Sequence, residues 1–287
     1  MMLLAALLLA AAPDAGIATC APCTVVPSPL AGFQRVLERK PAILAVGEYH
    51  EVNGAPKSEA GKPASSGKKV PSAIRRFTRE LLPALKGRLT SVVVETWMLN
   101  GKCGAAEKQA TAAVAKTTQR PKTTEDEVTT LLDRTYEMGA KNHILMIDCD
   151  DYRSMVDDAG SLDAEASLLL VKRKVEAKAL EVIEREEGGT GEKVLLLYGG
   201  AVHNDLQPLP EWSAYSFGPA LAQETGGRAV ELDLLVPEYV EGDEDLVKEP
   251  WFAGAMALAK AGKTVLINPH PEVYLLLFPR TRGGSRK

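Results

Sequence analysis

The sequence predicts an α/β fold, with a mostly parallel central sheet flanked by helices on both faces. The apolar runs at residues 42–46 and 194–198 do not alternate with polar residues, which is typical of strands buried on both faces. Strands and helices then alternate along the chain, as crossover connections between parallel strands require. The order of elements also repeats, which predicts two similar half-domains.

In the first half, helical spacing at residues 30–39 leads into the strand at 42–46. A second helix is expected at residues 74–85, because one face of it would carry the apolar residues Ile74, Phe77, Leu81, Leu82 and Leu85. A strand at 91–94 follows, then a helix at 125–138 that Gly139 can end, and a strand at 143–147.

The second half begins with a long helix at 162–187, which Gly188 and Gly189 end. The strand at 194–198 follows it. The remaining elements are a short helix at 219–225, a strand at 229–235, a helix at 251–261, and strands at 264–267 and 273–278.

Two segments are expected to be flexible insertions. Residues 53–71 are rich in Gly, Pro, Ser and Lys, and they form either a lid over the adjacent histidine motif or a disordered insertion. Residues 101–124 contain few apolar side chains, so we expect a loop there, with at most a weak helix around 105–116.

Composition and length indicate a single domain, and the N-terminal segment indicates that it is exported. The 287 residues carry a net charge of −4, which gives no reason to expect a nucleic-acid partner. Residues 3–12 are wholly apolar, which suits the core of a signal peptide, although a buried N-terminal helix is the alternative. We therefore expect a signal peptide at 1–19, an N-terminal segment at 20–40, and one α/β domain at 41–287.

The cysteines leave two destinations open for the exported chain. Ile17-Ala18-Thr19-Cys20 partly matches a bacterial lipobox, so Cys20 is a candidate lipid anchor, and this anchor is the only membrane contact expected. Cys20 and Cys23 are also candidates for a disulfide, with Cys103 as another partner. Cys149 follows an apolar strand and is expected to be a buried free thiol. The protein is thus either periplasmic or a membrane-anchored lipoprotein.

One motif occurs twice at the ends of predicted strands. Gly47-Glu48-Tyr49-His50 follows the first strand, and Gly199-Gly200-Ala201-Val202-His203 follows the strand at 194–198. Glycine at a strand end permits a sharp turn or a positive φ. The next strand of each half carries an acid near its end: Glu95 in the first half, and Glu231 and Asp233 in the second. Ligands of open α/β sheets bind at the carboxyl ends of strands, so both histidines are expected at one site.

The candidate catalytic residues are Glu48, His50, Glu95 and His203. His50, His203 and Glu95 could ligate Zn, Mn or Fe and leave one position for water, whose pKa the metal lowers. Without a metal, one histidine could deprotonate water while the other stabilises the oxyanion. Asp148 ends another strand, but it is expected to cap the following turn instead.

Two tyrosines flank the motifs. Tyr49 and Tyr198 are candidate cofactor-binding residues that could line the pocket or ligate haem iron, although burial against neighbouring side chains is the alternative. The other histidines, His143 and His270, are expected to be surface residues.

Gly47-Glu48-Tyr49-His50, Val92-Val93-Val94-Glu95 and the second glycine–histidine motif together resemble a superfamily of α/β proteins. It joins the ChaN-like haem-binding lipoproteins, the erythromycin-esterase-like proteins and the TraB/Tiki proteins. The chain is closest to the ChaN-like branch, which has the same glutamate two residues before the histidine. The resemblance covers about residues 41–237, and it implies two similar halves with Glu48, His50, Glu95 and His203 at a shared cleft.

Two functions follow as expectations. The first is an exported hydrolase of an ester or amide bond in a small molecule or peptide, with or without a divalent metal. The alternative is a surface protein that binds haem or iron without catalysis. The paired histidines with acids at strand ends favour the hydrolase, because they suit water activation better than a flat macrocycle.

Overall fold

The computed structural model describes residues 20–49, 70–97, 99–118, 123–185 and 193–281. The signal-peptide prediction, His50 and nearly all of the insertion predicted at 53–71 lie outside these residues. Within the described part, no helix is long and apolar enough to cross a membrane.

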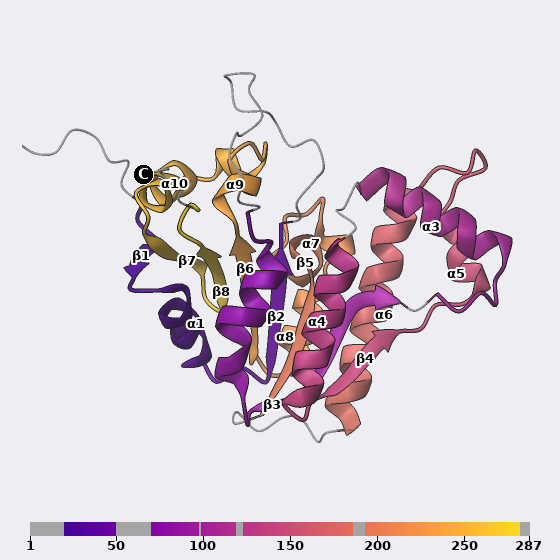
Figure 1. Cartoon of the computed structure of the whole chain (residues 1–287), viewed down its shortest axis with the longest axis horizontal. Helices are drawn as coiled ribbons and strands as arrows, with labels where there is room; N and C mark the ends of the chain where they lie inside the picture. The colour runs from indigo at the N-terminus through magenta and orange to yellow at the C-terminus, as the bar shows by residue number, and fades with distance from the viewer. Residues whose placement is uncertain (1–19, 50–69, 98, 119–122, 186–192, 282–287) are drawn as a thin grey trace, which may run out of the picture.

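An eight-stranded sheet forms the centre of the molecule (Figure 1). Its strands in spatial order are β1 (Cys23–Val26), β7 (Thr264–His270), β8 (Val273–Leu277), β6 (Ala229–Leu235), β2 (Ile43–Glu48), β5 (Val194–Gly200), β3 (Leu89–Trp97) and β4 (Lys141–Leu145). The six strands from β8 to β4 are parallel, while β7 runs antiparallel to β8 and to β1. The predicted α/β class with a mostly parallel sheet is therefore confirmed.

The strand order is symmetric about the central pair of β2 and β5. The strand that follows β2 in the chain, β3, lies on the far side of β5. The strand that follows β5, β6, lies on the far side of β2, and β4 and β8 continue the same pattern outward. The first and second halves of the chain are thus interleaved in one sheet, and the repeated order of elements has a counterpart in space.

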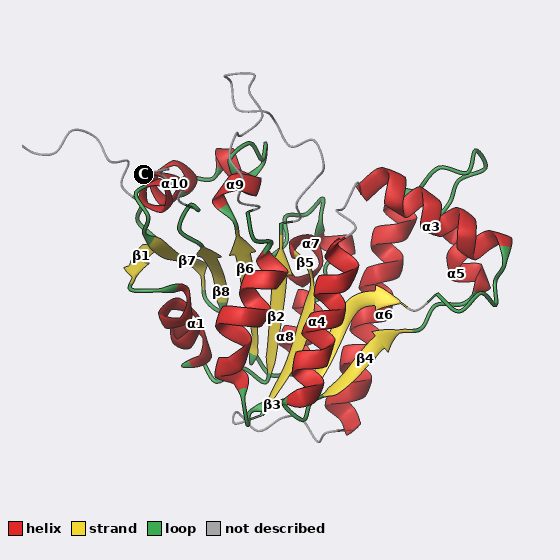
Figure 2. Cartoon of the chain, viewed as in Figure 1, coloured by secondary structure: helices red, strands yellow, loops and turns green. Residues whose placement is uncertain are grey.

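Helices cover both faces of the sheet (Figure 2). One face packs against α1 (Pro29–Leu37), α4 (Thr123–Glu137) and a helical segment made of α2 (Ala73–Arg76), the π-helical η1 (Phe77–Leu81) and the 3-10 turn η2 (Leu82–Leu85). The other face packs against α6 (Ala164–Arg185) and α8 (Gly218–Glu224). Apolar side chains therefore fill both faces, which explains why the central strands are apolar throughout.

Most of the remaining helices lie beside the outer strands of the sheet. α10 (Phe252–Lys260) packs against β7 and β8, and α9 (Pro237–Val240) and η4 (Leu246–Lys248) lie near it. Beyond β4, α3 (Ala105–Thr118) and α5 (Cys149–Ser154) form a small separate core with α6 around Ala110, Tyr152 and Met155 (Figure 1). Two short helices, α7 (Ala201–Asn204) and η3 (Ser213–Tyr215), follow β5.

Most of the segment at 101–124, where a loop with at most a weak helix was expected, is helical. Residues 105–118 form α3, close to the weak helix allowed at 105–116, and α4 already begins at Thr123. The segment folds because small side chains such as Ala110 and Ala113 are buried on one side of α3, which composition alone does not reveal. The short edge strand β1 was also missed, because only Val26 of its four residues is buried.

Candidate functional site

The first feature of the site is the direct pairing of the two glycine motifs. In the parallel pair of β2 and β5, Gly47 lies opposite Gly199 and Glu48 lies opposite Gly200. Both strands end at the same edge of the sheet, where β5 leads directly into α7 (Ala201–Asn204). The strands that carry the two motifs are therefore neighbours, but His50 lies outside the described residues, so the meeting of the two histidines at one site stays a prediction.

Strand alternation divides the acids between the two faces of the sheet. Val93 faces the core under α6 and α8, so Glu95, two residues later, lies on that face. Asp233 lies on the same face, because Ala229 of the same strand also belongs to that core. Glu48 lies on the opposite face, where it accepts a hydrogen bond from Tyr198. Glu48 and Glu95 therefore approach the site from opposite sides of the sheet.

Gly47 and Gly199 are needed for close packing, not for a positive φ. Neither is among the glycines with positive φ, and both remain within their strands. A Cβ atom on Gly47 would collide with the Asp233 carboxylate and lie 2.7 Å from both Ala201 Cα and Asn204 Oδ1. A Cβ atom on Gly199 would collide in the same way with the Glu95 carboxylate. Each glycine thus makes room for an acid that crosses over it from the neighbouring strand.

His203 is held in a defined tautomer on α7, the short helix that follows β5. Its Nδ1 lies 2.8 Å from the backbone oxygen of Tyr215. A carbonyl oxygen can only accept, so Nδ1 carries the hydrogen and the neutral ring keeps its lone pair at Nε2. The residue is only 3% exposed. Nε2 of His203 is therefore the ring nitrogen that the Tyr215 bond does not use.

Glu95 is fixed by the turn that leads to His203. Its Oε2 accepts a hydrogen bond of 2.7 Å from the backbone N–H of Gly200, the residue directly before α7. Glu95 is half-buried, and this bond gives its carboxylate a donor and ties β3 to the second motif. The structure thus brings Glu95 to the start of the helix that carries His203.

The two candidate haem tyrosines have different surroundings. Tyr198 is buried, its hydroxyl donates to Glu48 Oε2 at 2.8 Å, and its ring packs against Phe77 with centroids 5.4 Å apart. Burial raises the pKa of Tyr49, and the negative charge of Asp233 raises it further. Iron ligation by tyrosine uses the anion, which this environment disfavours.

Two residues of the site were not among the sequence candidates. Asp233 is 5% exposed and Asn204 is 2% exposed, and the Asn204 amide donates to Asp233 Oδ1 at 3.1 Å and to the Ala45 backbone oxygen at 3.2 Å. Burial, opposed by the Asn204 hydrogen bond, and the charge of Asp205 raise the pKa of Asp233 to about 7. Burial is also the main cause of a raised pKa at Glu231, whose carboxylate accepts from the Leu206 backbone.

The signal for Asp233 was present in the repeat. Asp233 pairs with Gly47 across β6 and β2, and the Glu95 carboxylate covers Gly199 from β3. Asp233 thus occupies in the second half the place that Glu95 occupies in the first. The sequence alone could not distinguish it from Glu231, because strand register was unknown.

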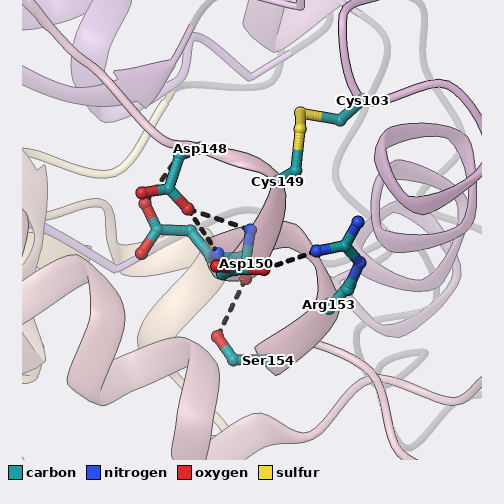
Figure 3. Close-up of polar contacts among 7 residues, drawn as sticks. Cys103, Asp148, Cys149, Asp150, Arg153 and Ser154 are labelled. Atoms are coloured by element: carbon teal, nitrogen blue, oxygen red, sulfur yellow. Dashed lines mark hydrogen bonds and ion pairs between the residues drawn. A yellow bond between two sulfur atoms is a disulfide. The ribbon is translucent and has the colours of Figure 1, made fainter.

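Asp148 is a helix cap, as the sequence predicted. Its Oδ1 accepts hydrogen bonds of 2.9 Å from the backbone N–H groups of Asp150 and Asp151 at the start of α5 (Figure 3). In turn, the Asp151 carboxylate accepts a hydrogen bond from the backbone N–H of Asp148, which completes a capping box. These bonds lower the pKa of Asp148, the one from Asp151 having the largest effect. Figure 3 also shows Arg153 beside Asp150 on the same turn.

All four cysteines are in disulfides. Cys103 pairs with Cys149 (Figure 3), and Cys20 pairs with Cys23. The prediction of a buried free thiol at Cys149 is therefore wrong, because the end of β4 and the start of α5 bring it to the loop before α3. A sulfur atom in a disulfide cannot carry a thioether-linked lipid, so the Cys20–Cys23 bond and a lipid anchor at Cys20 exclude each other.

Among the described residues, no group of three or more His, Cys, Asp or Glu side chains is placed to hold a metal ion. Glu95 and His203 belong to the ligand set predicted from the sequence, and its third member, His50, lies outside the described residues. The other histidines do not join the site: His143 Nε2 lies 3.4 Å from Ser91 Oγ on β3, and His270 is exposed at the turn between β7 and β8.

No protein-family model matches the chain, and no curated protein matches it. Among solved structures, a crystal structure of a protein from Bacillus cereus is similar at 11% sequence identity and a TM-score of 0.34. The match covers 92% of this chain and 97% of that chain. A similarity this weak carries no information about function.

Proposed function

We propose that this protein is an exported hydrolase of an ester or amide bond, with His203 as the base that activates water. The observation that carries the proposal is the bond from His203 Nδ1 to the Tyr215 backbone oxygen. It keeps the lone pair at Nε2, on a buried ring directly after one of the two paired glycine motifs. The resemblance of these motifs to the superfamily of ChaN-like and Tiki proteins supports the same proposal. Membership of that superfamily is therefore included in what we propose.

In the proposed reaction, His203 Nε2 takes a proton from water, and the resulting hydroxide attacks the carbonyl carbon of the substrate. The proton on the imidazolium then passes to the leaving oxygen or nitrogen. The Glu95 carboxylate, which accepts from the backbone N–H directly before α7, is assigned the stabilisation of the positive charge that forms on His203. His50 is assigned the second role, stabilisation of the oxyanion, because it follows the motif paired with that of His203.

A divalent metal is compatible with this chemistry but is not required by it. His203 Nε2 and Glu95 are donors of the types that Zn²⁺, Mn²⁺ and Fe²⁺ accept, and His50 would complete a three-ligand set. Such an ion would lower the pKa of a bound water. Only two of these three candidate ligands, His203 and Glu95, lie among the described residues. No step of the proposal is therefore assigned to a metal.

Export is supported by the cysteines. Disulfides persist in oxidising compartments and are rare in the cytosol. All four cysteines of the chain are paired, and one pair joins residues 46 positions apart. The mass of the mature chain tests the anchor directly, because a lipid on Cys20 adds mass and leaves Cys23 without its partner.

The proposed activity can be tested with p-nitrophenyl acetate and a p-nitroanilide as chromogenic probes. We expect His203→Ala and Glu95→Gln to lower kcat/KM by about 100-fold or more, the usual contribution of general acid–base groups. Glu95→Gln is informative because the amide oxygen can still accept the Gly200 bond. Glu137→Gln, at an exposed glutamate of α4, is the matched control and should leave the rate unchanged.

The same protein samples test the alternative. Metal content is measured before and after dialysis against a chelator, and hemin is titrated while the Soret band is followed. Saturable hemin binding that Tyr49→Phe or Tyr198→Phe abolishes, without hydrolysis of either probe, would replace the hydrolase with the haem-binding function. Hydrolysis that is the same in His203→Ala as in the wild type would remove His203 from the mechanism.

A further inference from the structure

We propose that Asp233 and Asn204 form a neutral acid–amide pair, with the proton on Asp233, that positions α7 relative to the end of β2. The effect of this pair on catalysis rests on the proposed function, because the pair is assigned a positioning role and does not itself react. The structural part of the inference stands on contacts that involve neither substrate nor metal.

The first argument is the place of Asn204 in the fold. Asn204 directly follows His203 on α7, and its amide nitrogen donates to Ala45 on β2 and to Asp233 on β6. Ala45 lies two residues before Gly47 on the strand that leads to the first motif. One side chain therefore connects the helix of the second motif to the strand of the first.

The second argument is an acceptor that lacks a donor. Asn204 Oδ1 is buried and has no hydrogen-bond partner within the described part of the chain. Both amide hydrogens are already directed to Ala45 and Asp233. An ionised Asp233 can only accept, so it could not satisfy this oxygen. A protonated Asp233 has an O–H group, and we infer that it donates to Asn204 Oδ1, in addition to the bond that Asp233 Oδ1 accepts from the amide.

The third argument is the charge around the pair. The titratable groups that face it are acids or a phenol: Glu231 on the same strand, Asp205 at the end of α7, and Tyr49 after β2. His270 acts on Asp205 from β7. Burial and the charge of Asp205 raise the pKa of Asp233 to about 7, although the Asn204 hydrogen bond lowers it, so the carboxyl is mostly protonated only below neutral pH.

The fourth argument is the relation between the two halves. Glu95 crosses over Gly199 and holds the backbone of the second motif through Gly200. Asp233 crosses over Gly47 of the first motif, but its carboxyl accepts a hydrogen bond from the side-chain amide of Asn204 instead of from a backbone N–H. The ends of β5 and β2 are therefore each contacted by an acid of the neighbouring strand, and the neutral pair is the version at the end of β2.

Infrared spectroscopy of the full chain tests the proton without substrate. We expect a carbonyl band of a protonated carboxylic acid that disappears as pH rises through about 7. Glu231→Gln, which removes the other buried acid of β6, should keep this band, and the double variant Asp233→Asn/Glu231→Gln should lose it. The band in Glu231→Gln reports on Asp233 even if the double variant does not fold. A spectrum of Glu231→Gln without a titrating acid band above about pH 5 would overturn the pair.

The pH profile of p-nitrophenyl acetate hydrolysis tests the positioning role. In the wild type, kcat should fall about ten-fold from its maximum at one pH unit above the pKa of Asp233, because only about a tenth of the acid is still protonated. The Asp233→Asn variant keeps both a donor and an acceptor at this position, so it should retain activity and lose the alkaline decline. An unchanged decline in this variant would overturn the positioning role.

The two proposals fail in different ways. A band that behaves as expected without hydrolysis in any sample would overturn the hydrolase and leave the acid–amide pair intact. Hydrolysis that depends on His203, with no titrating acid at Asp233, would overturn the pair and leave the hydrolase intact.

Discussion

Replacing Asp233 by asparagine should make the stability of the protein less dependent on pH. Asp233 is buried on the core face of β6, and its pKa rises from an ordinary value of 3.8 to about 7 on folding. A raised pKa means that the folded state holds the proton more tightly than the unfolded state. The stability that this acid contributes is therefore fully present below about pH 4, falls as pH rises towards 7, and is constant above that.

The size of the effect follows from the shift. A difference of about three pKa units corresponds to about 4 kcal/mol, at about 1.4 kcal/mol per unit. Asparagine has the same shape and no titrating proton. We expect the variant and the wild type to differ little at about pH 4, and the variant to be more stable by up to about 4 kcal/mol at about pH 8.

Urea unfolding between about pH 4 and pH 8, with both disulfides oxidised, measures this difference. Contributions from other titrating groups largely cancel when the variant is compared with the wild type at each pH. Asp158→Asn, at an exposed aspartate, is the control and should show a constant small difference. A difference for Asp233→Asn that is also constant across this range would refute the reasoning, since it would mean that Asp233 is ionised in the folded protein.

Three further predictions concern stability and use the same unfolding measurement. Gly47→Ala should lower the free energy of unfolding by about 1–3 kcal/mol, because the new methyl group meets Asp233, Asn204 and Ala201; a neutral effect would show that these groups can move apart. Replacing Cys103 and Cys149 together by serine should cost about 4 kcal/mol, from the loop of 46 residues that the disulfide closes; unchanged stability under oxidising conditions would mean that the bond does not form. Asp148→Ala should cost about 1 kcal/mol through loss of the α5 cap, while Asp150→Ala on the exposed side of the same turn should cost less.

Several parts of the fold could be predicted from local pattern. The central strands are apolar at every position because both faces of the sheet are covered, and this pattern placed β2, β5 and β6 within about two residues. The long helices α4 and α6 were placed as closely, since their periodicity extends over many turns. Short elements such as α5 and β1 were missed, because a few residues carry too little periodicity.

For the site, the sequence identified the two motifs but not what surrounds them. It predicted glycine for its backbone freedom, whereas Gly47 and Gly199 are required because carboxylates from neighbouring strands lie over them. It placed Glu48 and Glu95 together, whereas alternation along the strands puts them on opposite faces. It passed over Asn204, whose role exists only because α7 lies against β2 and β6.

The amino-acid sequence by itself determined the class of fold, the edge of the sheet at which the histidine motifs end, and the cap at Asp148. These features depend on residues close together in the chain, so hydrophobic period and side-chain chemistry are sufficient to predict them. Only the tertiary structure decided that Asp233 is the partner of Gly47, that Cys149 is bonded to Cys103, and that His203 carries its proton on Nδ1. Each of these depends on which distant strand or loop lies next to the residue, and strand order and register are set by the packing of the whole sheet.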